Sequence, residues 1–127
     1  MRNITIAGAA LALFAVSSTT ALAHTKVVAS TPAQGTTVAK PKLVTLTFSE
    51  ALLPPTAAAT IVMTAMPGMA NHPEMAIRNF TTAFSGGNRT MTLNLRQPLR
   101  TGTYEVRWRA AGADGHRMVG TVGFTVS

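Results

Sequence analysis

Hydrophobic and polar residues alternate with a period of two in several short segments of the chain. In one of them Val44, Leu46 and Phe48 are separated by two threonines. Successive side chains of a β-strand point to opposite faces, so each segment is predicted to be a strand with one face on a hydrophobic core. The segments with this pattern are residues 44–48, 60–64, 91–95, 104–109 and 122–126.

The segments between these predicted strands are rich in glycine, proline and asparagine, which favour turns. No stretch has the pattern of a helix of two or more turns, and one more strand is expected within residues 24–30. We therefore predict an all-β fold. It would be a Greek-key β-sandwich or barrel of about seven short strands, of the cupredoxin-like or immunoglobulin-like kind.

The first 23 residues have the features of a cleaved secretory signal peptide. Arg2 precedes an apolar run at residues 4–16, which is too short to span a bilayer, and a small-x-small cleavage pattern ends at Ala23. Cleavage there would make His24 the first residue of a single β domain, residues 24–127. No second run of membrane-spanning length follows, so we expect the mature protein to be soluble.

Several classes of function are excluded by composition and pattern. The chain has no cysteine, which rules out disulfides, thiolate metal sites and a thiol nucleophile. The formal net charge is +7, but the basic residues are scattered and the aromatic residues lie at core positions, so no nucleic-acid partner is expected. No serine–histidine–acid set, paired-carboxylate site or glycine-rich phosphate loop is supported by its context.

Residues 63–75 combine a cluster of methionines with a histidine. Met63 continues a predicted strand and fits core packing, but prolines and a glycine interrupt regular structure after it. Thioether sulfur is a soft donor that suits Cu(I), whereas the alternative is a flexible or adhesive loop without metal. The candidate Cu(I) ligands are Met63, Met66, Met69, His72 and Met75.

A second group of donors lies at Asp114-Gly115-His116. In extended chain, residues two apart face the same way, so Asp114 and His116 can present a carboxylate and an imidazole to one point. Taken alone, a turn aspartate beside a surface histidine is the commoner explanation. If the first strand packs beside this segment, the α-amine and ring of His24 join the set. Nitrogen and oxygen donors in a tetragonal arrangement favour Cu(II).

The chain resembles the CopC family of periplasmic copper-binding proteins over essentially all of residues 24–127. The resemblance is carried by the stretch that begins His24-Thr-Lys-Val-Val-Ala-Ser-Thr-Pro, by Leu46-Thr-Phe-Ser-Glu50, by the methionine-rich stretch, and by Asp114-Gly-His116. It implies copper sites at the two ends of the sandwich, with Cu(II) at His24, Asp114 and His116. Cu(I) would bind at His72 and the nearby methionines, and Glu50 would lie near the Cu(II) site without binding the metal.

The resemblance further implies a periplasmic copper carrier or buffer that is not an enzyme and contributes to copper resistance or copper import. Its partners would be copper ions and an inner-membrane copper transporter of the CopD type, and the protein is expected to be a monomer. Two features depart from the family pattern. The loop looks one residue longer, and Arg117 follows His116 where proline is common.

Two other functions are consistent with parts of the sequence. Copper-dependent oxidative enzymes of the polysaccharide monooxygenase type also use an N-terminal histidine with a second histidine. They keep a copper position open for oxygen, which Asp114 would fill here, and this chain lacks an aromatic platform for a polymer. The remaining alternative is a plain β-sandwich interaction module whose histidines and methionines are incidental.

Overall fold

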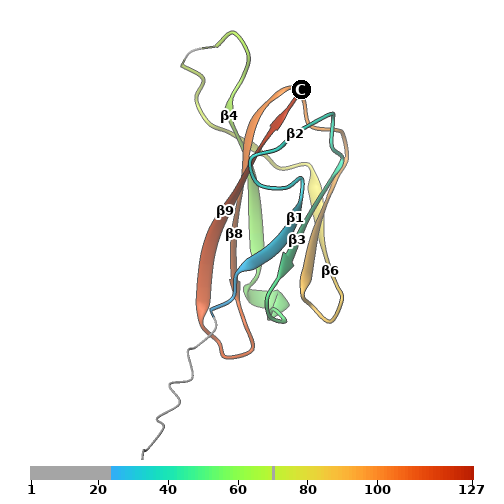
Figure 1. Ribbon diagram of the computed structural model, residues 1–127, viewed down its shortest axis with the longest axis vertical. Helices are drawn as coiled ribbons and strands as arrows, with labels where there is room; N and C mark the ends of the chain where they lie inside the picture. Colours follow the sequence, from blue (N-terminus) through green and yellow to red (C-terminus); the bar gives the residue numbers. More distant parts are fainter. Residues whose placement is uncertain (1–23, 70) are drawn as a thin grey trace, which may run out of the picture.

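Two β-sheets face each other in the computed structural model, which describes residues 24–69 and 71–127 (Figure 1). One sheet has four strands in the order β1-β3-β7-β6, and the other has five in the order β2-β9-β8-β4-β5. The predicted signal peptide, residues 1–23, lies outside the described residues. Within the described residues, no helix has the length and hydrophobicity needed to cross a membrane.

The chain changes sheet after β1, β2, β3, β5 and β7. A short 3-10 helix, η1 (Pro54–Thr56), lies between β3 and β4. The strands are β1 (Val27–Thr31), β2 (Thr37–Val38), β3 (Leu43–Phe48), β4 (Ala58–Ala65), β5 (Met75–Ile77), β6 (Phe80–Ser85), β7 (Thr90–Leu95), β8 (Gly102–Ala111) and β9 (Arg117–Val126).

The core between the sheets is formed by the residues that the period-two pattern placed inward. In β8, Tyr104, Val106 and Trp108 are buried, whereas Glu105 and Arg107 are partly exposed. Each fully buried aliphatic or aromatic side chain contributes roughly 1.5–3 kcal/mol. The other predicted inward residues are also buried: Val44, Leu46, Phe48, Ile61, Met63, Met91, Leu93, Leu95, Val122, Phe124 and Val126.

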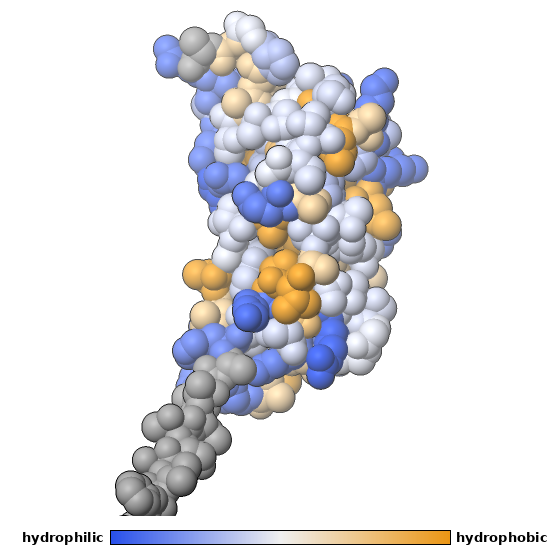
Figure 2. Space-filling model, in the orientation of Figure 1, coloured by the Kyte–Doolittle hydropathy of each residue, from blue (hydrophilic) through white to orange (hydrophobic). Residues whose placement is uncertain are grey.

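Aromatic contacts within and between the sheets add to this core. Phe48 of the four-stranded sheet meets Trp108 of the five-stranded sheet edge-to-face, with ring centroids 5.0 Å apart. Tyr104 stacks on Phe124 of the neighbouring strand at 5.8 Å, and its hydroxyl donates to the Arg100 carbonyl at 2.7 Å. On the face shown in Figure 2, hydrophobic residues reach the surface in small separate patches among hydrophilic ones.

The predicted all-β sandwich is confirmed, but the described residues form nine strands rather than about seven. The strands that were not predicted are β6, where Thr82 interrupts the hydrophobic alternation of Phe80 and Phe84, and the short strands β2 and β5, which have two and three residues. Strands this short contain too few residues for an alternation to be recognised. The segment at residues 24–30 does form a strand, β1, displaced slightly toward the C-terminus.

Gly120 of β9 lies directly under the Trp108 ring and gives the first prediction. A Cβ atom on Gly120 would lie 2.5 Å from Cζ2 and 2.7 Å from Nε1 of that ring. Gly120→Ala should therefore displace the indole and lower the free energy of unfolding by about 1–3 kcal/mol, as overpacked cores do. Urea denaturation followed by the fluorescence of Trp108, the single tryptophan, measures this change.

Gly123→Ala in the same strand is the matched control. A Cβ atom there would meet its nearest neighbour, Nε2 of Gln34, at an ordinary 3.6 Å. We expect a much smaller loss of stability and an unchanged tryptophan spectrum. Equal losses in the two variants would show that the close contact at Gly120 does not determine the packing of the indole.

Candidate metal centres

The two predicted groups of donors lie at opposite ends of the sandwich (Figure 1). The β4–β5 connection, which contains the methionines, emerges from one end. The β8–β9 connection, which contains Asp114 and His116, lies at the other end, where the described chain begins. The sheets therefore separate a sulfur-rich group from a group of nitrogen and oxygen donors.

Asp114 and His116 are held together in the turn between β8 and β9. The turn is closed by a hydrogen bond from the Gly115 amide to the Gly112 carbonyl at 2.9 Å. The Asp114 carboxylate accepts a hydrogen bond from the His116 amide at 3.0 Å and lies 2.9 Å from Nδ1 of the His116 ring. The structure thus brings together the two side chains that the sequence placed at one point.

These contacts affect the pKa of Asp114 and the ring nitrogen that His116 can offer to a metal. The hydrogen bond from the His116 amide, followed by the contact with its ring, holds the pKa of Asp114 below its usual range. When Nδ1 carries the proton and donates to Asp114, Nε2 is the ring nitrogen left to bind a metal. A carboxylate that orients an imidazole in this way is a common support for a metal ligand.

Glu50 and Thr25 meet the same turn above Gly112. Thr25 is buried, and its hydroxyl donates to Oε2 of Glu50 at 3.4 Å. Both side-chain oxygens lie 2.6 Å from the position that a Cβ atom on Gly112 would occupy, and Oδ1 of Asp114 lies 3.6 Å from it. The carboxylates of Glu50 and Asp114 therefore lie near one point. The resemblance had led us to expect Glu50 near this group of donors.

His24 precedes Thr25 and is exposed at this end of the sandwich. Within residues 24–69 and 71–127, however, no three His, Cys, Asp or Glu side chains are grouped so that they could hold a metal. The structure pairs Asp114 with His116 but does not gather the His24 ring into one group with them. The predicted three-residue Cu(II) ligand set therefore stays a prediction.

The methionine loop, defined as the described residues 66–69 and 71–74, begins with a tight turn. The amide of Met69 donates to the carbonyl of Met66 at 3.2 Å, and the two residues form an isolated β-bridge. Pro67 and Gly68 occupy the central positions, and Gly68 has φ +78°, a conformation that favours glycine. This turn places two of the predicted thioether residues beside each other.

The other candidate ligands differ in their exposure. Met63 and Met75 are cross-strand partners in β4 and β5, but Met63 is 3% exposed and Met75 is 48% exposed. The terminal methyl of Met63 packs 3.2 Å from where a Cβ atom on Gly102 would lie. Met63 is thus part of the core, as its place in the alternation indicates, whereas Met75 and Met69 are accessible.

His72 carries a feature that suits a metal ligand. Its Nδ1 is buried and has no hydrogen-bond partner among the described residues. A buried polar atom without a partner costs about 1–3 kcal/mol, and a metal bond would satisfy it. The donors of this end, one imidazole and several thioethers, fit a soft ion such as Cu(I).

Sequence reasoning missed two residues of the turn end, Thr25 and Gly112. No motif marks Thr25, which is buried because the segment before β1 packs against the β8–β9 connection. Gly112 could have been noticed as a small residue next to a predicted metal site, because only a glycine leaves room for the oxygens of Thr25 and Glu50.

Together, the fold and its donor groups define a small β-sandwich protein with candidate metal donors at both ends. A protein-family model, the CopC domain, matches residues 27–127. The chain therefore belongs to the CopC family, which confirms the family predicted from the sequence.

Relatives of known name agree with this membership. Copper resistance protein C of Pseudomonas syringae pv. tomato is 46% identical over 111 residues, which cover 86% of this chain and 85% of the relative. Copper resistance protein C of Escherichia coli is 37% identical over 106 residues, which cover 84% and 83%. These relatives are named copper resistance proteins, and the prediction of a copper-binding protein that is not an enzyme agrees with those names.

Solved structures show the same sandwich. The crystal structure of PcoC, a methionine-rich copper resistance protein from Escherichia coli, aligns with a TM-score of 0.73 at 34% identity. The alignment covers 83% of this chain and 100% of PcoC. CopC from Methylosinus trichosporium OB3b aligns with a TM-score of 0.59 at 27% identity, covering 82% of this chain and 94% of that one.

The Asp114–His116 contact gives a prediction for the metal-free protein. In His116→Ala, the pKa of Asp114 should rise part of the way toward its ordinary value, because the ring is lost but the amide hydrogen bond remains. A pKa lowered by folding stabilises the protein above the unfolded-state pKa, and this stabilisation is lost as the pH falls through the lowered value. Carboxyl 13C NMR titration measures the pKa directly.

His72→Ala, at the other end of the sandwich, is the control and should leave the pKa of Asp114 unchanged. If His116→Ala also leaves it unchanged, the ring does not stabilise the Asp114 carboxylate.

Proposed function

We propose that this chain is a periplasmic copper carrier or buffer that binds Cu(II) at one end of the sandwich and Cu(I) at the other. The observation that carries the proposal is the separation of two chemically different donor groups on opposite ends of one CopC-family domain. The copper resistance function of the named relatives supports copper as the metal. The role of the protein is then copper resistance or copper import.

The Cu(II) site in this proposal combines His24, Asp114 and His116. His24 supplies its α-amine and a ring nitrogen, His116 supplies a ring nitrogen, and Asp114 supplies a carboxylate oxygen. For Asp114 and His116 to bind one ion, the contact between Asp114 and Nδ1 of His116 must open. Nitrogen and oxygen donors in a tetragonal set favour Cu(II) over softer ions. Glu50 lies close by as a second negative charge and does not bind the metal directly.

The proposed Cu(I) site uses His72 with Met66, Met69 and Met75, which lie on or next to the methionine loop. The turn at Pro67 and Gly68 pairs the backbones of Met66 and Met69, and the unpartnered Nδ1 of His72 provides a nitrogen. Met63 is a further candidate whose sulfur reaches the metal only if its side chain leaves its contact with Gly102.

The difference in donor softness gives the proposed carrier its selectivity. Cu(I) is retained by thioethers, and Cu(II) is retained by amine, imidazole and carboxylate. The oxidation state of copper therefore decides which end of the protein it occupies. Neither site requires an open coordination position, in keeping with a protein that holds metal and performs no reaction.

The proposed cellular setting follows from the expected signal peptide. Removal of residues 1–23 during export to the periplasm creates the free α-amine of His24, so the Cu(II) site would be complete only in the mature, soluble protein. The proposed partner is an inner-membrane copper transporter of the CopD type, which would exchange copper with a monomeric carrier.

The Cu(II) proposal is tested with protein that begins at His24. It should bind one Cu(II) per chain and give a single tetragonal, nitrogen-rich electron paramagnetic resonance signal. One additional alanine before His24 converts the α-amine into an amide and should weaken Cu(II) binding by at least about tenfold. Equal affinity in the two proteins would contradict the proposed amine ligand. Cu(I) binding at the other end should be the same in both and serves as the control.

The Cu(I) proposal is tested with Met66→Leu combined with Met69→Leu. Leucine has a similar volume but no sulfur, so the fold should persist while affinity for Cu(I) falls by at least about tenfold in competition with a chromophoric chelator. Met91→Leu is the control, because Met91 is a fully buried core residue of β7. Unchanged Cu(I) affinity in the double variant would exclude these two thioethers as ligands.

A further inference from the structure

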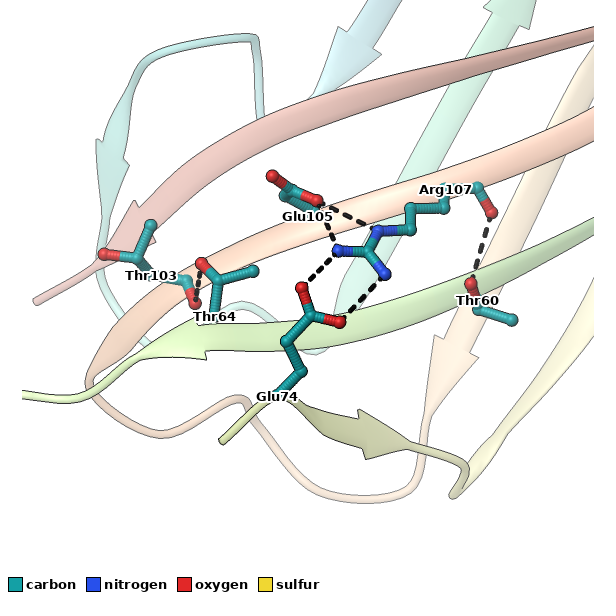
Figure 3. A network of polar contacts seen from close by, with 6 residues as sticks. All are labelled: Thr60, Thr64, Glu74, Thr103, Glu105 and Arg107. Carbon is teal, nitrogen blue, oxygen red and sulfur yellow. Dashed lines mark hydrogen bonds and ion pairs between the residues drawn. The ribbon is translucent and has the colours of Figure 1, made fainter. Parts of the chain in front are cut away.

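An ion-pair network links the end of the methionine loop to the centre of the five-stranded sheet (Figure 3). Nη2 of Arg107 lies 2.7 Å from Oε1 of Glu74, and Nη1 donates to Oε2 of the same carboxylate at 3.1 Å. Nε of Arg107 also donates to Oε2 of Glu105 at 3.0 Å. Arg107 thus binds the Glu74 carboxylate in a bidentate contact through Nη1 and Nη2, and it binds the Glu105 carboxylate through Nε.

The ion-pair network reaches across strand β4. Glu74 directly precedes β5, whereas Arg107 and Glu105 are on β8, and β4 lies between these two strands. On the same face, the hydroxyls of Thr60 and Thr64 donate to carbonyls of β8 at 3.5 and 3.4 Å (Figure 3). The side of the network on β8 therefore belongs to a well-paired part of the sheet.

The side on β5 is paired far less extensively. β5 is an edge strand of the sheet and pairs with β4 through three residues, at Ile61↔Ile77, Val62↔Ala76 and Met63↔Met75. A short edge strand has few hydrogen bonds to define its register, and a slip by one residue reverses the face of every side chain. The contact between Glu74 and Arg107 supplies a side-chain constraint at the end of a strand that has few backbone hydrogen bonds.

The alternation of side chains connects this constraint to the methionine donors. Glu74 points to the outer face, where Arg107 lies, so the next residue, Met75, is directed to the opposite face with its partner Met63. A slip would move the thioether of Met75 to the outer face. Fixing Glu74 therefore also fixes the place of Met75 and the point at which the loop rejoins the sheet.

The pair is exposed, and its strength comes from its geometry. The side chains of Arg107 and Glu74 are 41% and 57% exposed, and isolated exposed pairs contribute little to stability. A two-pronged contact shared with a second carboxylate is stronger than an isolated pair. The hydrogen bonds from Arg107 lower the pKa of Glu74, and those to Glu74 and then Glu105 raise the pKa of Arg107, so Glu74 and Arg107 stay charged at neutral pH.

We propose that Arg107 is a positioning residue for the methionine loop: by clamping Glu74 it sets the register of β5 and hence the place of Met75 among the loop donors. The consequence for Cu(I) rests on the proposed function, but the effect on β5 does not involve copper.

The first test uses the metal-free protein. Amide hydrogen exchange at residues 75–77 should become about three- to tenfold faster in Arg107→Gln and in Glu74→Gln, while exchange in β8 stays slow. Arg109→Gln is the matched control. Arg109 lies on the same outer face of β8, carries the same charge and has no ion pair within the described residues. If amide exchange in β5 is equally fast in Arg107→Gln and Arg109→Gln, the proposal is wrong.

The second test measures affinity for Cu(I) by chelator competition. Arg107→Gln should weaken Cu(I) binding about three- to fivefold, and Arg107→Glu, which places three carboxylates together, about tenfold. Combining Arg107→Glu with Glu74→Arg should recover at least half of that loss, which a general destabilisation of β8 would not allow. Cu(II) affinity should be unchanged in every variant, because Arg107 is remote from the β8–β9 connection.

The outcomes separate the two proposals. If the unmodified protein does not bind Cu(I), the proposed Cu(I) site fails, and hydrogen exchange alone decides the role of Arg107. If it binds Cu(I) but the exchanged pair recovers nothing, the positioning role is wrong and the Cu(I) site stands. If Arg107→Gln does not fold, Glu74→Gln, which changes only an exposed loop residue, provides the same test.

Discussion

The burial of alternate side chains between two facing sheets is the constraint on which the rest of this structure depends. Tyr104, Val106 and Trp108 of β8 point inward, so Glu105 and Arg107 must point outward. The core cluster consists of hydrophobic side chains, and nitrogen and oxygen donors must therefore come from outside it. A domain of this kind can offer donors to a metal at its ends, where the connections between strands leave the core.

Much of the fold could be predicted from the sequence because the core pattern is local. Every residue that the alternation placed inward is buried. The number of such segments predicted a sandwich or a barrel, and the structure has the two sheets of a sandwich. The pairing of Asp114 with His116 was predictable for the same reason, since the two residues are two positions apart. β2 and β5 were missed because strands of two or three residues leave no readable pattern.

Contacts between distant segments were beyond sequence reasoning. Glu74 and Arg107 are 33 positions apart and meet only because β4 brings β5 and β8 into one sheet. The meeting of Thr25, Glu50 and the turn at Gly112 similarly depends on how three separate segments pack. The position of His24 relative to Asp114 also depends on how separate segments pack. In the described residues, the His24 side chain is not grouped with Asp114 and His116 into a set that could hold a metal.

β8 is the element that both ends share. It begins at Gly102, against which Met63 packs, and is followed by Gly112, above which the oxygens of Glu50 and Thr25 meet. In both places a side chain on the glycine would collide with a neighbour close to a donor group. Midway between them, Arg107 holds the return of the methionine loop. A substitution in this one strand can therefore affect either donor group through packing alone, without changing any donor. Loss of copper binding in a β8 variant consequently identifies a ligand only when the fold and the opposite site are shown to be intact.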